Sequence, residues 1–134
     1  MTGYSGTALA KKLGIKEGYR IALVNAPQNF ADELGPLPAG VVVVQRLQPS
    51  LNLILFFAAS QSELSKRFPE LVKRLVANGM LWVAWPKKSS GVMSDLSFEV
   101  VQAVGLAEGM VDTKVCAVNE VWSGLRFVIR LRDR

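Results

Sequence analysis

Residues 51–88 read LNLILFFAASQSELSKRFPELVKRLVANGMLWVAWPKK, the pattern of a strand, a helix and a second strand. The run Leu51–Phe57 is apolar without alternation, as in a strand covered on both faces. The next segment predicts a helix whose apolar residues share one stripe: Leu64, Phe68, Leu71, Val72, Leu75 and Val76. Asn78-Gly79 is expected to end this helix before a second buried strand over Met80–Trp85. The stretch therefore predicts a parallel β-α-β unit, and such sheets bind ligands at the carboxyl ends of their strands.

The rest of the chain extends this unit on both sides. Ser5 or Thr7 is expected to cap a short helix over Ala8–Leu13, and a later helix is expected over residues 94–106. Further strands are expected at four short apolar runs, the last two joined as an antiparallel hairpin: Ile21–Val24, Val41–Val44, Val111–Val118 and Leu125–Leu131. The sequence predicts an α/β protein with about six strands, a mostly parallel sheet in three layers, and one domain over residues 1–134.

The composition indicates a large apolar core. Half of the 134 residues are apolar and 20% are charged, which argues against disorder and leaves apolar surface for a homodimer. No apolar run approaches the roughly 18 residues of a membrane span, and Met1–Gly6 lacks the regions of a signal peptide. We therefore expect a cytoplasmic protein without membrane contact. The single cysteine, Cys116, is expected to be a buried, inert thiol.

The charged residues exclude several kinds of chemistry. The net charge of +5 favours anionic partners, and ion pairs are expected between Glu63 and Arg67 and between Glu70 and Arg74 on the predicted helix. The chain has no histidine, so the commonest general base and metal ligand is missing. Its acids show no motif spacing. The residues therefore predict no catalytic group, no metal site and no cofactor.

The strand ends nevertheless predict a binding edge. If Val111–Val118 runs parallel to the other strands, the turn after it emerges beside Pro86–Gly91. This edge would combine lysine charges for an anion, indole walls and orienting polar groups, from seven residues: Asn25, Ser60, Trp85, Lys87, Lys88, Glu120 and Trp122. We expect a small anionic ligand or a protein partner there. The alternative is that the two tryptophans pack in the core and the lysines lie in a solvated loop.

The last predicted strand carries an alternating row of arginines. Leu125, Phe127, Ile129 and Leu131 are expected to point one way, and Arg126, Arg130, Arg132 and Arg134 the other. Charge on an edge strand prevents aggregation between strands, which is one interpretation. The other is a phosphate-contacting surface that combines this row with Lys66 and Lys73 and binds nucleic acid weakly.

Four strings identify a family resemblance across the whole chain: residues 3–7 (GYSGT), 9–14 (LAKKLG), 85–91 (WPKKSSG) and 120–125 (EVWSGL). Together they resemble a family of small bacterial proteins classed as a domain of unknown function, which implies no activity. The element order from Leu51 onward is similar to the second half of Rossmann-like methyltransferases and implies a Rossmann-like architecture. Two features that those enzymes use for S-adenosylmethionine are absent, because the first loop is Asn25–Asn29 without glycine, and Val44 is followed by Gln45 rather than an acid.

These observations favour a non-enzymatic binding or regulatory module with an anion-accepting edge at the carboxyl ends of the strands. Two alternatives stay open. One is weak nucleic-acid binding through a basic surface, and the other is a diverged S-adenosylmethionine-dependent transferase.

Overall fold

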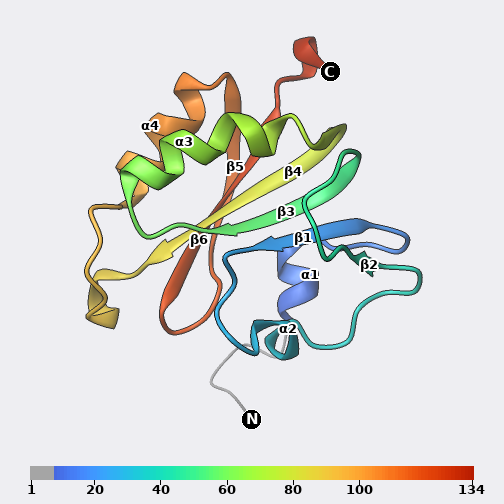
Figure 1. Ribbon diagram of the computed structural model, residues 1–134, viewed down its shortest axis with the longest axis horizontal. Helices are drawn as coiled ribbons and strands as arrows, with labels where there is room; N and C mark the ends of the chain where they lie inside the picture. The colour runs from blue at the N-terminus through green and yellow to red at the C-terminus, as the bar shows by residue number, and fades with distance from the viewer. Residues whose placement is uncertain (1–7) are drawn as a thin grey trace.

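The computed structural model describes residues 8–134 and contains a six-stranded sheet with helices on both faces (Figure 1). The strands are β1 (Arg20–Val24), β2 (Val42–Val43), β3 (Leu51–Phe57), β4 (Leu75–Pro86), β5 (Met110–Ala117) and β6 (Trp122–Ile129). The helices are α1 (Leu9–Leu13), α2 (Phe30–Glu33), α3 (Gln61–Val72) and α4 (Phe98–Ala107), with short 3-10 turns η1 (Lys88–Ser90) and η2 (Leu131–Asp133). The predicted caps at Ser5 or Thr7 lie outside the described residues.

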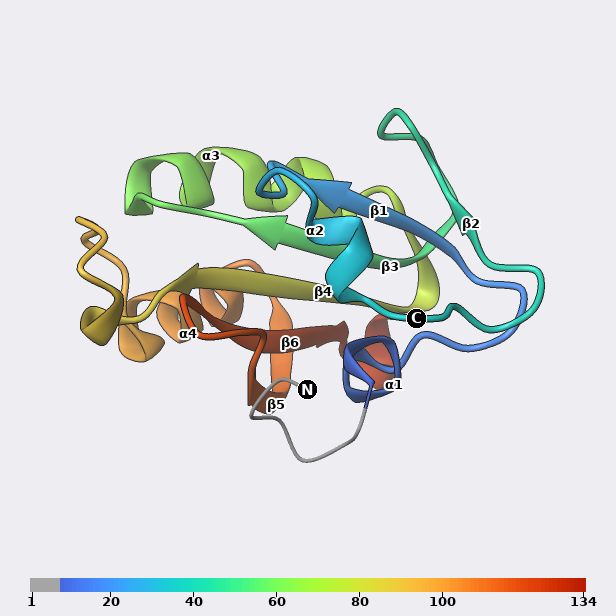
Figure 2. The ribbon, with the colours of Figure 1, turned by 90° about the horizontal axis from the view of Figure 1, so that it is seen from below.

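The strand order is β2-β1-β3-β4-β6-β5, so β2 and β5 form the two edges of the sheet (Figure 2). Strands β1 to β4 pair in parallel, and β6 pairs antiparallel with both β4 and β5. Because β5 and β4 are both antiparallel to β6, β5 runs in the same direction as β4. The predicted fold class is therefore confirmed: a mostly parallel α/β sheet of six strands with an antiparallel hairpin at its C-terminal end.

Two apolar cores lie on the two faces of the sheet. On one face, α3 and α4 cover side chains that include Ile54, Phe56 and Phe127. On the other face, α1 and α2 cover a set that includes Leu55, Phe57 and Trp82. Neighbouring residues of β3 thus alternate between the cores, and all of them from Leu53 to Phe57 are buried. The unbroken apolar run reflects burial on both faces, as expected for an interior strand.

Helix α3 is shorter than its sequence pattern predicts. The helix ends at Val72, three residues after Pro69, whereas Leu75 and Val76 already belong to β4. Asn78-Gly79 lies inside that strand and does not stop a helix. The pairing shifts here, from Leu51 with Leu75 to Leu53 with Met80, so the extra residues of β4 bulge out of the ladder.

Strand β2 also differs from the prediction. Val41–Val44 reads as a buried strand, but only Val42 and Val43 pair, and Val42 is 46% exposed. The reason is its position at the edge of the sheet, where β1 is its single neighbour. Long connections lead into and out of it (Figure 2).

Candidate functional site

The strand order reverses direction between β1 and β3. The chain leaves β1 to form β2 on one side, then returns to form β3 on the other side of β1. In open α/β sheets this reversal, at the carboxyl ends of the strands, is the usual ligand position. Here it lies between Asn25, which follows β1, and residues 58–60, which follow β3.

The loop after β1 turns without glycine. Asn25 and Asn29 both have a left-handed backbone, with φ of 58° and 67°. Asparagine is one of the few side chains that tolerate this region, because its short amide can bond locally. Two asparagines give the loop turns for which glycine is normally required.

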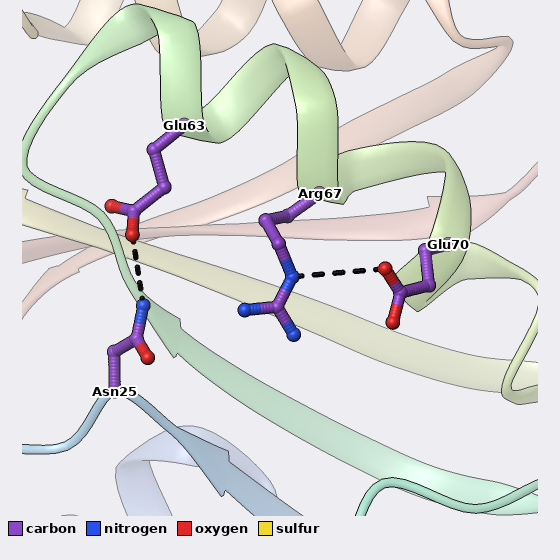
Figure 3. Close-up of polar contacts among 4 residues, drawn as sticks. All are labelled: Asn25, Glu63, Arg67 and Glu70. Atoms are coloured by element: carbon purple, nitrogen blue, oxygen red, sulfur yellow. Dashed lines mark hydrogen bonds and ion pairs between the residues drawn. The ribbon is translucent and has the colours of Figure 1, made fainter.

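Glu63 joins the two loops at the reversal point, and Figure 3 shows its contact with Asn25. The amide Nδ2 of Asn25 donates to Glu63 Oε2 at 3.0 Å, and the backbone N–H of Ala59 donates to Oε1 at 3.3 Å. The helix position of Glu63 is fixed by Ser60, whose Oγ accepts from the Glu63 backbone N–H at 3.1 Å as the N-cap of α3. The side chain is half-buried. We call this arrangement of Asn25, Ala59 and Glu63 the Glu63 clasp.

The Glu63 clasp replaces an ion pair that the sequence predicts. Arg67 forms an ion pair with Glu70 instead, with 3.8 Å between Arg67 Nε and Glu70 Oε2 (Figure 3). The guanidinium of Arg67 also lies 5.7 Å from the centre of the Phe56 ring. Glu63 is thus directed to the loops rather than along its own helix.

Ser94 and Asp95, which precede α4, form hydrogen bonds with the backbone at the start of α3. Asp95 Oδ1 accepts from the backbone N–H of Gln61 at 2.8 Å, and the Ser94 hydroxyl donates to the carbonyl of Ala59 at 2.7 Å. On the other side of the sheet end, Glu33 Oε1 accepts from Asn119 Nδ2 at 2.9 Å. Three carboxylates, those of Glu63, Asp95 and Glu33, therefore accept hydrogen bonds at this end of the sheet. Such acceptors suit hydroxyl donors and cations better than anions.

The residues of the predicted anion site do not form one pocket lining. Trp85 is 6% exposed and packs in the α3/α4 core, whereas Trp122 is half-buried against Phe57 on the opposite face, with ring centres 5.0 Å apart. The two indoles are separated by the sheet and are not two walls of one site. Their positions agree with the alternative interpretation, in which Trp85 and Trp122 pack against apolar side chains of the two cores.

The other predicted residues divide into two groups. Lys87 is half-buried and Lys88 is exposed, and the Lys87 backbone N–H donates to the Val121 carbonyl at 2.7 Å. This bond places the two predicted turns side by side, with Glu120 exposed in the second turn. Asn25 and Ser60 lie at the reversal point instead, where Asn25 binds Glu63 and Ser60 caps α3.

The predicted arginine row is interrupted. Strand β6 ends at Ile129, and the next residues form η2, with Leu131 79% exposed. Arg130 and Arg132 therefore do not continue the alternation. Strand β6 lies between β4 and β5, so its charges do not protect a sheet edge, and that interpretation is wrong.

The predicted nucleic-acid residues also lie on different faces. Arg126 has its guanidinium 5.9 Å from the Trp82 ring in the α1/α2 core. Lys66 and Lys73 are exposed on and just after α3, the helix that covers the opposite face. The structure does not bring these lysines together with Arg126.

Cys116 lies half-buried in β5. Burial raises the pKa of its thiol, and the charges of Lys12, Lys114 and Arg126 oppose that effect only in part. Among residues 8–134, no group of three or more histidine, cysteine or acidic side chains could hold a metal ion. No helix in this part of the chain is long and apolar enough to cross a membrane.

No family model matches the chain, and no curated protein matches it by sequence. Solved structures do match. A SAM-dependent methyltransferase from Aquifex aeolicus is 18% identical with a TM-score of 0.59, covering 91% of this chain and 88% of its own. A protein provisionally assigned as a type 11 methyltransferase from Sulfolobus solfataricus is 12% identical with a TM-score of 0.63, covering 91% and 89%. Fibrillarin from Aeropyrum pernix, solved with natively bound S-adenosyl-L-methionine, is 12% identical with a TM-score of 0.60, covering 90% and 73%.

These likenesses establish the fold. The chain has the Rossmann-like α/β fold of SAM-dependent methyltransferases, as the element order from Leu51 onward predicts. They also contradict our main functional prediction, a non-enzymatic module with an anion-accepting edge, and favour the alternative of a diverged transferase. The resemblance to a bacterial family of unknown function gains no support from these comparisons.

The sequence interpretation missed the role of Glu63. A signal for it was present, since Ser60 and Glu63 have the spacing of a capping box, in which the acid reaches back toward the start of the helix. In the structure it reaches one residue further, to Ala59, and also across to Asn25. That second contact depends on β1 and β3 being neighbours.

Proposed function

We propose that this protein is a diverged S-adenosylmethionine-dependent transferase that binds the cofactor at the reversal point between β1 and β3. The observation that carries the proposal is the Glu63 clasp, a carboxylate held at the position where this fold class binds ligands. The fold likeness to SAM-dependent methyltransferases supports the same position.

The residues at this point suit the chemistry of the cofactor. S-adenosylmethionine carries a sulfonium, an ammonium group and two ribose hydroxyls, all of which a carboxylate can stabilise or accept a hydrogen bond from. Glu63 offers that carboxylate, and Asn25 adds an amide that can donate and accept. The left-handed turns at Asn25 and Asn29 bend the loop as glycines would. When bound, the cofactor supplies an electrophilic methyl group.

The chain departs from the usual methyltransferase pattern in a way that assigns Glu63 a larger role. An acid normally follows the second strand, but β2 leads to Val44 and the exposed Gln45. The carboxylate at the reversal point comes from α3 instead. We infer that ligand hydroxyls replace the Asn25 amide as donors to Glu63, which leaves Asn25 free to turn toward the ligand.

Calorimetry with S-adenosylmethionine and its demethylated product, S-adenosylhomocysteine, tests the proposal. We expect both to bind the wild-type chain. Glu63→Gln should weaken binding by about tenfold or more, because a hydrogen bond to a charged group is worth roughly 1.5–3 kcal/mol. Glu70→Gln is the matched control, since it removes the same charge from an exposed position on the same helix.

Two results would overturn the proposal. Absence of heat with both ligands at millimolar concentration would exclude a cofactor site of useful affinity. Equal affinities of the wild type and Glu63→Gln would exclude the reversal point as its location. Each variant must also unfold at a temperature near that of the wild type, so that weaker binding is not caused by partial unfolding. This control is needed because Glu63 also bonds to the loop before α3.

A further inference from the structure

A basic face lies on the side of the sheet that α1 covers. We define it by three residues whose charges lie close together, Lys12 of α1, Lys114 of β5 and Arg126 of β6, and Lys11 is the exposed neighbour of Lys12 on the same helix. Two reciprocal bonds join the helix to the hairpin. Lys12 Nζ donates to the Ala117 carbonyl at 3.1 Å, and Lys114 Nζ donates to the Lys12 carbonyl at 3.3 Å. Lysines from distant parts of the sequence are thus held close to each other.

Arg126 is fixed in orientation on this face. Its Nε donates to Thr113 Oγ1 at 2.8 Å, and its guanidinium lies over the ring of Trp82. Gly14 at the end of α1 lies beside it, since a Cβ on Gly14 would be 3.8 Å from Arg126 Nη1. A guanidinium held in this way loses little conformational freedom when it binds a phosphate.

A shift of register in β5 places Asp112 and Lys114 on opposite faces of the sheet. The pairing shifts between Asp112, which faces Phe127, and Lys114, which faces Arg126. Asp112 consequently lies on the α4 face, where its Oδ2 accepts from Gln102 at 3.0 Å. Lys114 is turned to the α1 face. Bulges characteristically re-aim side chains in this way.

The result is a concentration of positive charge on this face. Lys12, Lys114 and Arg126 lie close enough together for all three charges to act on the Cys116 thiol between them. Clustered like charges repel one another and destabilise the folded chain. An anionic partner that lies across the face would relieve this repulsion.

We propose that the basic face binds the phosphodiester backbone of a nucleic acid. The charges come from three elements, α1, β5 and β6, and Lys114 and the neighbouring Lys11 are exposed, which suits several spaced phosphates along one strand. The proposal does not depend on the transferase activity. It also differs from the predicted surface, since it replaces Lys66, Lys73, Arg130 and Arg132 with α1 and β5 residues.

Fluorescence anisotropy with a short labelled single strand, in RNA and DNA versions of one sequence, tests the proposal across a range of salt concentrations. We expect log Kd to vary linearly with log salt concentration. The double variant Lys11→Gln/Lys114→Gln should bind more weakly and lower the slope by about 1.4, since each lost phosphate contact on a single strand contributes roughly 0.7. Similar affinities for both strands indicate backbone recognition, and a preference for RNA indicates contacts to the 2′-hydroxyl.

The matched control is Lys66→Gln/Lys73→Gln, which removes the same charge from exposed positions on the opposite face. We expect it to bind like the wild type. Because Lys114 also bonds to α1, Lys114→Arg is a second test that keeps the charge and should keep the affinity. Equal losses in the two double variants would mean that only net charge matters and would overturn the proposal. So would the absence of any salt-dependent binding.

Discussion

Gly105 lies at a close contact between helix α4 and the sheet. It lies inside α4, and a Cβ at this position would be 2.0 Å from Cε1 of the buried Phe127 ring. We expect Gly105→Ala to lower the free energy of unfolding by about 1–3 kcal/mol, because overpacking at this distance outweighs the roughly 1 kcal/mol that alanine gains in a helix. Urea denaturation measures the change.

The partner ring provides the control for Gly105. Phe127→Leu removes the ring atoms that an alanine side chain would meet. In that background, Gly105→Ala should cost less than it does in the wild type, which makes the two substitutions non-additive. A Gly105→Ala variant as stable as the wild type would show that α4 moves away from the sheet without penalty.

The tryptophans show what residue patterns alone do not reveal. Trp85 pairs with Ser123, and Trp122 pairs with the next residue of β4, Pro86. Side chains alternate faces along a strand, so this offset of one residue places the two indoles on opposite sides of the sheet. The sequence places the two turns beside each other, and the hydrogen bond from Lys87 to Val121 agrees with this. The sequence does not specify the register between β4 and β6, which decides the face on which each indole lies.

At the scale of elements, the loop after β1 carries the clearest prediction. Asn25 has φ of 58°, which glycine adopts readily and a β-branched residue does not. We expect Asn25→Gly to change stability by less than about 1 kcal/mol, since the loss of one exposed hydrogen bond to Glu63 is offset by a backbone conformation that glycine adopts readily. Asn25→Val should lower the free energy of unfolding by about 1–2 kcal/mol. Chemical denaturation compares the two variants.

If Asn25→Val proved as stable as Asn25→Gly, the left-handed turn would not be required by the fold. Asn29→Gly, with a similar φ of 67°, extends the comparison to the second turn of the same loop.

The boundary between α3 and β4 shows why element ends are hard to predict. Leu71, Val72, Leu75 and Val76 continue a helical spacing, yet the last two are strand residues. The spacing of four apolar residues near a junction fits both structures over such a short length. Pairing of Leu51 with Leu75 decides between them, and that long-range contact has no local signal.

At the scale of the whole molecule, the sequence correctly predicts the mostly parallel sheet and its C-terminal antiparallel hairpin. Burial on both faces explains this success, because β3, an interior strand, is apolar at every position except Asn52. The same rule fails at the edge, where Val41–Val44 is apolar but only Val42 and Val43 form strand β2 and Val42 is exposed. The Glu63 clasp depends on the neighbourhood of β1 and β3, so the strand order has to be known before the candidate site can be recognised.

The strand order also predicts how stability is distributed. Strands β3 and β4 have neighbours on both sides, and Leu55 and Val83 are completely buried. Strand β2 has one neighbour, although the amides of Val42 and Val44 donate to backbone carbonyls at 2.9 Å. Amides that exchange by local opening are protected by the structure around them more than by the length of their own bonds.

We therefore expect native-state hydrogen exchange, measured by NMR, to separate these amides. The amides of Leu55 and Val83 should exchange only through global unfolding, so their rates should follow the global free energy of unfolding in mild denaturant. Those of Val42 and Val44 should exchange orders of magnitude faster and respond little to denaturant, since opening the edge exposes little surface. Equal protection at Val42 and Leu55 would mean that β2 unfolds only together with the central sheet, and that the edge strand belongs to the same cooperative unit as β3.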